Sequence, residues 1–190
     1  MESIELFFKL GFGHVLDPQA LDHLFFISAF TIPFQFKDTR QLLWWTTLFT
    51  VGHTLSLVGN YYFEINPSAR WIEFFIPLSI LIACVPLITG TSAARSQRYL
   101  SGLIFIFGIV HGFGFSRYFG MIVPEEQATT GLLSFALGVE GAQIVIIIGV
   151  LCVAWLLVAV FSMPKEKWKL VAGAMIASQA LEMTLQNWPL

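Results

Sequence analysis

Charged residues are scarce in this chain of 190 amino acids. Only 12% of the residues are Asp, Glu, Lys or Arg, whereas 56% are hydrophobic. A soluble domain carries about 25% charged residues because its surface must be hydrated. The shortage of charge therefore argues against an ordinary soluble domain, and the net charge of −2 provides no basic face for nucleic acid.

The chain also lacks the motifs of several common enzyme classes. It has two cysteines, no CxxC pair, no Gly-rich phosphate loop and no Ser-His-Asp order. Both cysteines, Cys84 and Cys152, lie in apolar runs, so we expect buried, unreactive thiols rather than a disulfide. The first five residues include two glutamates and no basic residue, so we expect no secretory signal peptide.

What the chain has instead is long apolar segments. Blocks of about 20 apolar residues can cross a hydrocarbon layer, and they do so as helices because backbone groups in lipid must be paired internally. The sequence predicts one transmembrane domain over residues 1–190, an all-α polytopic helix bundle with about six spans. A short interfacial or re-entrant segment is expected at Ile4–Gly13. The expected spans are Asp22–Phe36, Gln41–Asn60, Arg70–Thr89, Arg98–Ser116, Gly131–Phe161 and Trp168–Trp188.

Loop charges predict an orientation for this bundle. Seven Lys and Arg residues follow the first, third and fifth expected spans, against three on the other side. The seven are Lys37, Arg40, Arg95, Arg98, Lys165, Lys167 and Lys169. By the positive-inside rule these loops face the cytoplasm. Both termini are therefore expected outside the cytoplasm, in an inner (cytoplasmic) membrane.

All four histidines are associated with the apolar segments. His14 and His23 flank the segment before the first span, His53 lies in Gly-His-Thr-Leu-Ser-Leu, and His111 begins His-Gly-Phe-Gly-Phe-Ser. An ionisable residue inside a membrane is costly and is functional by default. At a rise of 1.5 Å per residue, His53, His111 and Glu140 lie about 10, 9 and 13 Å from the outer ends of their spans. We therefore expect the polar groups of four spans at one depth in the outer half of the membrane.

Imidazoles and carboxylates at one depth suit a divalent transition metal, with Ni, Co, Zn and Fe as candidates. The predicted ligands or near-ligands are His14, Asp22, His23, His53, His111 and Glu140. Three residues, Gln143, Asp17 and Ser56, are expected to support the ligands from a distance. Packing roles compete with this interpretation: any one histidine can be a hydrogen-bonded core residue, and Asp17 before Pro18 is typical of a turn. The hydroxyls of Thr54 and Ser56 are expected to bond backbone carbonyls.

At these residues the chain resembles the HupE/UreJ family of small bacterial membrane proteins, over nearly its whole length. The four ordered motifs are His14–His23, Gly52–Leu57, His111–Phe115 and Ala136–Gln143. The resemblance implies six or so helices and a role in nickel or cobalt uptake for hydrogenase and urease maturation. The chain departs from the family pattern at Ala20, where Gly is usual, and at Ala136, where Asn is usual. These departures leave the identity of the metal open.

Three functions follow from this reading. The favoured one is a divalent metal permease with no catalytic residue. The second is a membrane-embedded Zn or Fe metalloenzyme with a coordination position free for water. The third is an accessory subunit that delivers metal to a partner. Transport needs a path on both sides of the site, and the inner halves are nearly all apolar apart from Thr46, Thr47 and Gln179. The expected partners are the metal ion and membrane lipid, and a homo-oligomer stays open.

Overall fold

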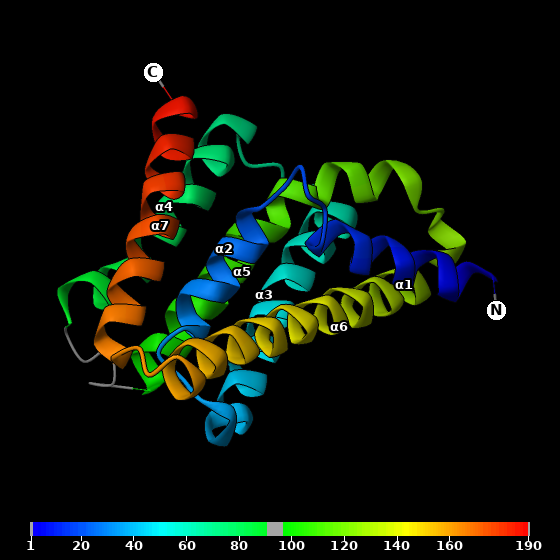
Figure 1. Cartoon of the computed structure of the whole chain (residues 1–190). Coiled ribbons are helices and arrows are strands. Elements are labelled where there is room, and N and C mark those ends of the chain that lie inside the picture. Colours follow the sequence, from blue (N-terminus) through cyan, green and yellow to red (C-terminus); the bar gives the residue numbers. More distant parts are fainter. Residues whose placement is uncertain (1, 91–96, 190) are drawn as a thin grey trace.

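The computed structural model describes residues 2–90 and 97–189, and every regular element in these ranges is a helix (Figure 1). The α-helices are α1 (Glu2–Val15), α2 (Asp22–Thr31), α3 (Thr39–Phe63), α4 (Ala69–Thr89), α5 (Gln97–Ile122), α6 (Ala128–Trp155) and α7 (Lys165–Gln186). Short 3-10 turns, η1 (Phe36–Asp38) and η3 (Glu125–Gln127), precede α3 and α6, and a π-helical turn, η4 (Leu156–Val160), extends α6. The predicted all-α bundle is confirmed. Arg95, one of the seven residues used to predict the orientation, lies outside the described residues.

The expected count of six spans is only partly supported. Three described segments are long and apolar enough to cross a membrane: Ala69–Thr89, Leu100–Ile122 and Glu125–Val160. The ten residues of α2 span about 15 Å, half of a hydrocarbon layer. The other two long helices are too polar by composition: α3 carries Thr, His and Gln side chains, and α7 carries Lys, Glu and Gln. Four helices therefore belong to the bundle but are not both long and apolar enough to be candidate spans: α1, α2, α3 and α7.

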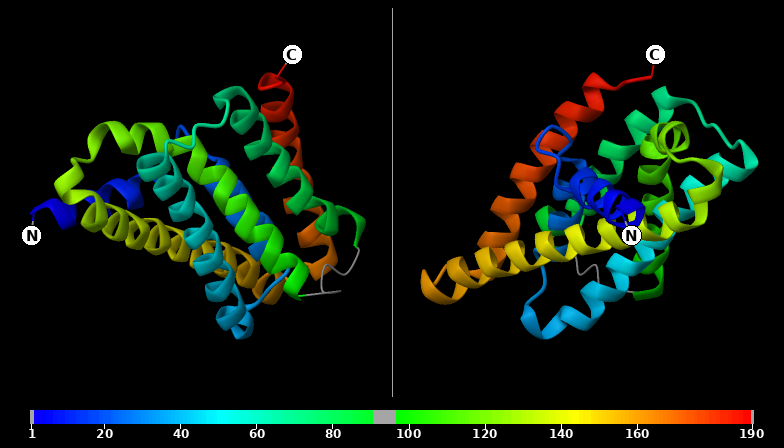
Figure 2. Two further views of the ribbon diagram at one scale, coloured as in Figure 1. Left: turned by 180° about the vertical axis from the view of Figure 1, so that it is seen from behind. Right: turned by 90° about the vertical axis from the view of Figure 1, so that its right-hand side faces the viewer.

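The helices pack mainly in pairs: α3 against α5, α1 against α6, and α4 against α7. Helix α6 is the longest and runs obliquely across the molecule, with α1 beside its N-terminal half (Figures 1 and 2). Because successive long helices alternate in direction, η1 and the starts of α3, α5 and α7 lie toward one end of the bundle. The turn with Lys37 and the start of α7, with Lys165, Lys167 and Lys169, therefore share that end.

Glycines let the paired helices approach to backbone contact. A Cβ atom at Gly11 of α1 would overlap the carbonyl oxygen of Phe135, and one at Gly138 of α6 would overlap that of Phe8. The α3–α5 pair repeats the arrangement, because a Cβ at Gly52 or Gly108 would overlap a carbonyl of the facing helix. Small residues at such crossings are the usual means by which membrane helices pack closely. These glycines therefore set the distance between α1 and α6 and the distance between α3 and α5.

The interior is aromatic and aliphatic, and many large apolar side chains also face outward. Phe26, Phe49, Phe119 and Phe135 are among the largest fully buried side chains. Most of the apolar side chains of α6 that lie off the helix interfaces are exposed, as a lipid-facing surface would be. Both cysteines are free thiols, as expected. The expectation that both are buried is wrong for Cys152, which lies on the exposed face of α6.

The close crossing of α1 and α6 predicts a difference between two glycines of the same helix. Gly138→Ala should lower the Tm in detergent, with a loss of about 1–3 kcal/mol because the new methyl group must push backbone apart. Gly149→Ala is the matched control, since nothing lies within 4 Å of its Cβ position. It should leave the Tm unchanged or raise it, because Ala favours the helix by about 1 kcal/mol. Equal Tm changes in the two variants would contradict the packing.

Candidate metal centre

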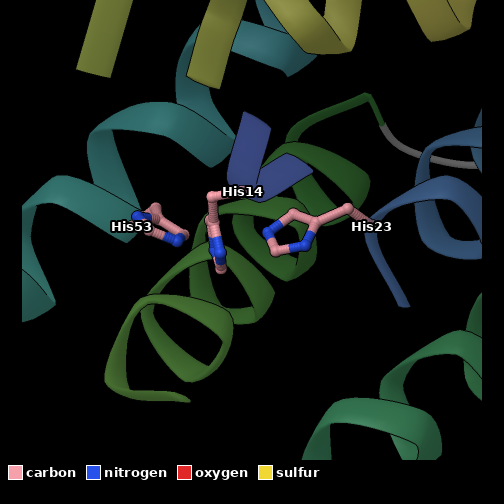
Figure 3. Close-up of side chains that lie close together, drawn as sticks. All are labelled: His14, His23 and His53. Carbon is pink, nitrogen blue, oxygen red and sulfur yellow. The ribbon is translucent and has the colours of Figure 1, made fainter. Parts of the chain in front are cut away.

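Three histidines from three helices meet inside the bundle (Figure 3). His14 lies in the last turn of α1, His23 in the first turn of α2, and His53 in the middle of α3. One potential ligand atom from each lies within 4.8 Å of the others. The ring centroid of His14 lies 4.8 Å from that of His23 and 5.8 Å from that of His53. The chain reversal between α1 and α2 thus brings the flanking histidines of one short segment together.

His111 of α5 lies beside this group of three, on a fourth helix. Its ring centroid lies 5.4 Å from that of His23. The Nδ1 atom of His111 is 2.8 Å from the carbonyl oxygen of Phe107, one turn earlier in α5. Because a carbonyl can only accept, Nδ1 carries the proton and donates it to this bond. In the neutral ring, Nε2 of His111 therefore keeps a free lone pair.

The Nε2 atoms of all four histidines are buried and have no hydrogen-bond partner among the residues that the structure describes. His23, His53 and His111 are only 1–2% exposed. An unsatisfied buried polar atom costs about 1–3 kcal/mol, so four in one group call for a ligand. Three atoms that lie within 4.8 Å of one another are each about 2.8 Å or less from a common point, against a metal–imidazole bond of about 2.0–2.1 Å. Shifts of less than about 1 Å would bring them to bonding distance, so the residues fit a transition metal.

Asp22 orients one of these rings. Its Oδ1 atom accepts a bond from Nδ1 of His23 at 3.2 Å and another from the His23 backbone N–H at 2.9 Å. With Nδ1 donating, the Nε2 lone pair of His23 faces the other histidines. A carboxylate behind a metal-binding imidazole fixes the ring and raises its basicity. Of the two roles predicted for Asp22, the structure provides the orienting contact, and direct ligation stays a prediction.

Aromatic side chains and a close helix crossing surround the histidines. The rings of Phe115 and Phe135 lie 4.1 and 5.9 Å from that of His14, and Phe49 lies 5.2 Å from His111. The hydroxyl of Ser56 donates to the carbonyl of His53 at 2.7 Å, and it lies where a Cβ of Gly112 would be. Ser56 therefore contributes to the site through the backbone and the helix crossing.

Glu140 and Gln143 form a separate polar line between α6 and α3. The Thr47 hydroxyl donates to Glu140 Oε1 at 2.6 Å, and the Thr50 hydroxyl donates to Gln143 Oε1 at 3.3 Å. Thr50 and Thr47 precede His53 by three and six residues, about 4.5 and 9 Å along the helix. The closest ligand group in the described residues contains histidines alone. Metal ligation by Glu140 and support by Gln143 stay predictions.

The remaining predicted residues have local partners. Asp17 is exposed, and its carboxylate accepts from the Gln19 backbone N–H at 2.9 Å, as its turn interpretation requires. Thr46 and Thr54 donate to carbonyls one turn earlier in α3. The sequence reasoning missed Thr47 and Thr50 as partners of α6. Their spacing of three residues matches that of Glu140 and Gln143, and this signal could have found them.

Two comparisons with known proteins gave no match, and one did. A protein-family model described as "HupE / UreJ protein" matches residues 1–189. The match includes all four histidines and the Glu140–Gln143 pair. No curated protein and no solved structure matches the chain.

The contact between Asp22 and His23 predicts a loss of metal affinity in Asp22→Ala. Removing a carboxylate behind a metal-binding imidazole weakens binding by 10–100-fold in typical sites. Ni²⁺ or Co²⁺ affinity, measured by competition with a chromogenic chelator, should fall by at least about tenfold. The matched control is Asp17→Ala, which removes an exposed carboxylate of the same loop and should leave the affinity unchanged. Equal affinities in the two variants would remove Asp22 from the site.

Proposed function

The chain belongs to the HupE/UreJ family, and from this premise we propose that it carries a divalent transition metal of the nickel or cobalt type across a membrane. The family match and the apolar helices indicate a membrane protein with a metal-related role. The observation that carries the proposal is the group of four buried histidine Nε2 atoms without a partner. The metal is the cargo, and His14, His23, His53 and His111 are its proposed ligands.

The donor set favours a transition metal over the common hard cations. Imidazole nitrogen suits Ni, Co, Cu, Zn and Fe, whereas Mg²⁺ and Ca²⁺ prefer oxygen ligands. Neutral imidazoles leave the double charge of the ion poorly compensated at low dielectric. Asp22, in contact with His23, supplies a compensating negative charge at the site. Glu140 of α6, beside Thr47 of α3, supplies a second negative charge.

Transport also needs a route away from the histidines. The pairs Thr50–Gln143 and Thr47–Glu140 extend polar groups along α3 toward the end of the bundle that carries Lys37. Gln143 is buried, and its Nε2 atom has no hydrogen-bond partner within the described ranges, so this amide can still donate a hydrogen bond. We propose that the ion leaves the histidines past Gln143 and is received by Glu140. Thr46 bonds its own helix and Gln179 is exposed, so neither is assigned a place on the route.

The metalloenzyme alternative rests on the compact group of His14, His23 and His53. Three protein ligands with a free fourth position are typical of catalytic zinc sites. His111 beside His23 argues against a free position, because it offers a fourth imidazole. The orientation with both termini outside the cytoplasm stays part of the proposal, and a reporter fused at Leu190 that is active only when exported would support it.

Purified protein in proteoliposomes tests the transport proposal through two steps that variants can separate. The double variant His53→Ala, His111→Ala should lose near-stoichiometric metal, measured by elemental analysis, and with it Ni²⁺ or Co²⁺ uptake. Glu140→Gln should retain the metal at the histidines but slow uptake by at least about tenfold, because the neutral amide cannot compensate the ion at low dielectric.

The matched control for Glu140 is Glu182→Gln, an exposed carboxylate of α7 that is bonded to Gln186. Its uptake should equal that of the unmodified protein. If metal binds tightly but no flux appears under either a pH gradient or a membrane potential, the transport proposal is wrong. The metalloenzyme alternative is then favoured. Unchanged metal content in the double histidine variant would overturn the site itself.

A further inference from the structure

A cleft of about 310 Å³ lies well away from the histidines, at the end of the bundle where α6 passes into α7. The turn after α2, the C-terminal end of α6 with η4, and the start of α7 form its walls. Its rim carries Lys37, Lys165 and Lys169. Its apolar lining includes Phe34, Leu151 and Val158. The cleft thus combines a cationic rim with an apolar wall.

Among the described residues, two of the three rim lysines have no carboxylate paired with them. Lys169 pairs with Glu166 at 2.8 Å. In the described parts of the chain, Lys37 and Lys165 form no ion pair. Both side chains are exposed. A second hollow, of about 640 Å³ and lined by Arg40 and Trp44, also reaches Lys37, so Lys37 faces hollows on two sides.

Trp168 adds an unsatisfied donor to the same cleft. It lines the cleft, and its indole Nε1 atom is buried without a hydrogen-bond partner. An indole nitrogen can only donate, so this group can bond an acceptor oxygen of a bound ligand. The rim and the indole therefore call for a ligand with anionic or acceptor oxygens.

The helix that forms the apolar wall is irregular at this point. The backbone N–H of Phe161 bonds the carbonyl of Leu156, five residues earlier, as in a π-helix. Such turns are rare and occur frequently at functional sites. The π-turn carries Val158 and Ala159, both of which line the cleft. The irregularity thus coincides with the cleft.

We propose that this cleft binds one anionic phospholipid, with its phosphate at Lys37 and Lys165 and an acyl chain along Leu151 and Val158. Basic pockets between membrane helices bind anionic headgroups through such lysines, and tryptophan is enriched at the same level of a membrane. A headgroup or glycerol-ester oxygen supplies the acceptor for Trp168. A small soluble anion would leave the apolar wall in water, and a zwitterionic lipid would leave the rim uncompensated.

Native mass spectrometry of the full chain in detergent tests this proposal with phosphatidylglycerol and phosphatidylcholine of identical acyl chains. One phosphatidylglycerol should be retained at a concentration at least tenfold lower than that needed for phosphatidylcholine. The double variant Lys37→Gln, Lys165→Gln should lose this preference. The control Arg117→Gln, Lys167→Gln removes two exposed cations that do not line the cleft and should retain it.

Metal content, measured in the same samples, should be equal in all three proteins, which shows that the variants are folded and separates the lipid site from the metal site. Glycerol phosphate at millimolar concentration should not displace the lipid, because it cannot fill the apolar wall. Equal retention of the two lipids, an unchanged preference in the Lys37, Lys165 variant, or displacement by glycerol phosphate would each overturn the proposal.

Discussion

The rest of this structure depends on four buried imidazole nitrogens that have no hydrogen-bond partner in the described part of the chain. Leaving them unsatisfied costs several kcal/mol in total, at about 1–3 kcal/mol for each buried polar atom. The surrounding architecture nevertheless holds them in place: glycine crossings bring α3 to α5 and α1 to α6, and a short reversal brings His23 back beside His14. Such an arrangement is unfavourable for packing alone and favourable for a bound metal.

Two carboxylates divide the electrostatic work that neutral imidazoles cannot do. Asp22 contacts His23 directly and orients its ring. Glu140 of α6 accepts a hydrogen bond from Thr47 of α3, about two turns before His53. In the transport proposal, the charge at the site would stabilise the bound ion and the second charge would favour its departure, as a carrier requires and a permanent catalytic site does not. The separation of the two carboxylates is therefore the structural basis of the transport proposal.

Sequence reasoning located the histidines because intramembrane imidazoles are costly and few, and their motifs lie on different helices. It also predicted the backbone bonds of Thr54 and Ser56 from their position inside a helix. It predicted Glu140 at the depth of the histidines by counting residues from the end of a span, and such a count measures position along one axis only. Helix α6 runs obliquely to the other helices, so an equal number of residues from the end of a span does not mean an equal depth in the bundle. The count of six spans is only partly supported, and the predicted burial of Cys152 is wrong, for a related reason: an apolar run in the sequence looks the same whether it faces lipid, the core or a short helix.

The central claim is that the histidines bind a transition metal together, and X-ray absorption spectroscopy of the Ni²⁺-loaded protein measures this directly. The account predicts a first shell of nitrogen and oxygen, with multiple scattering from at least three imidazole rings that falls in His53→Ala. A shell with one imidazole or none, or one containing sulfur from cysteine, would contradict it.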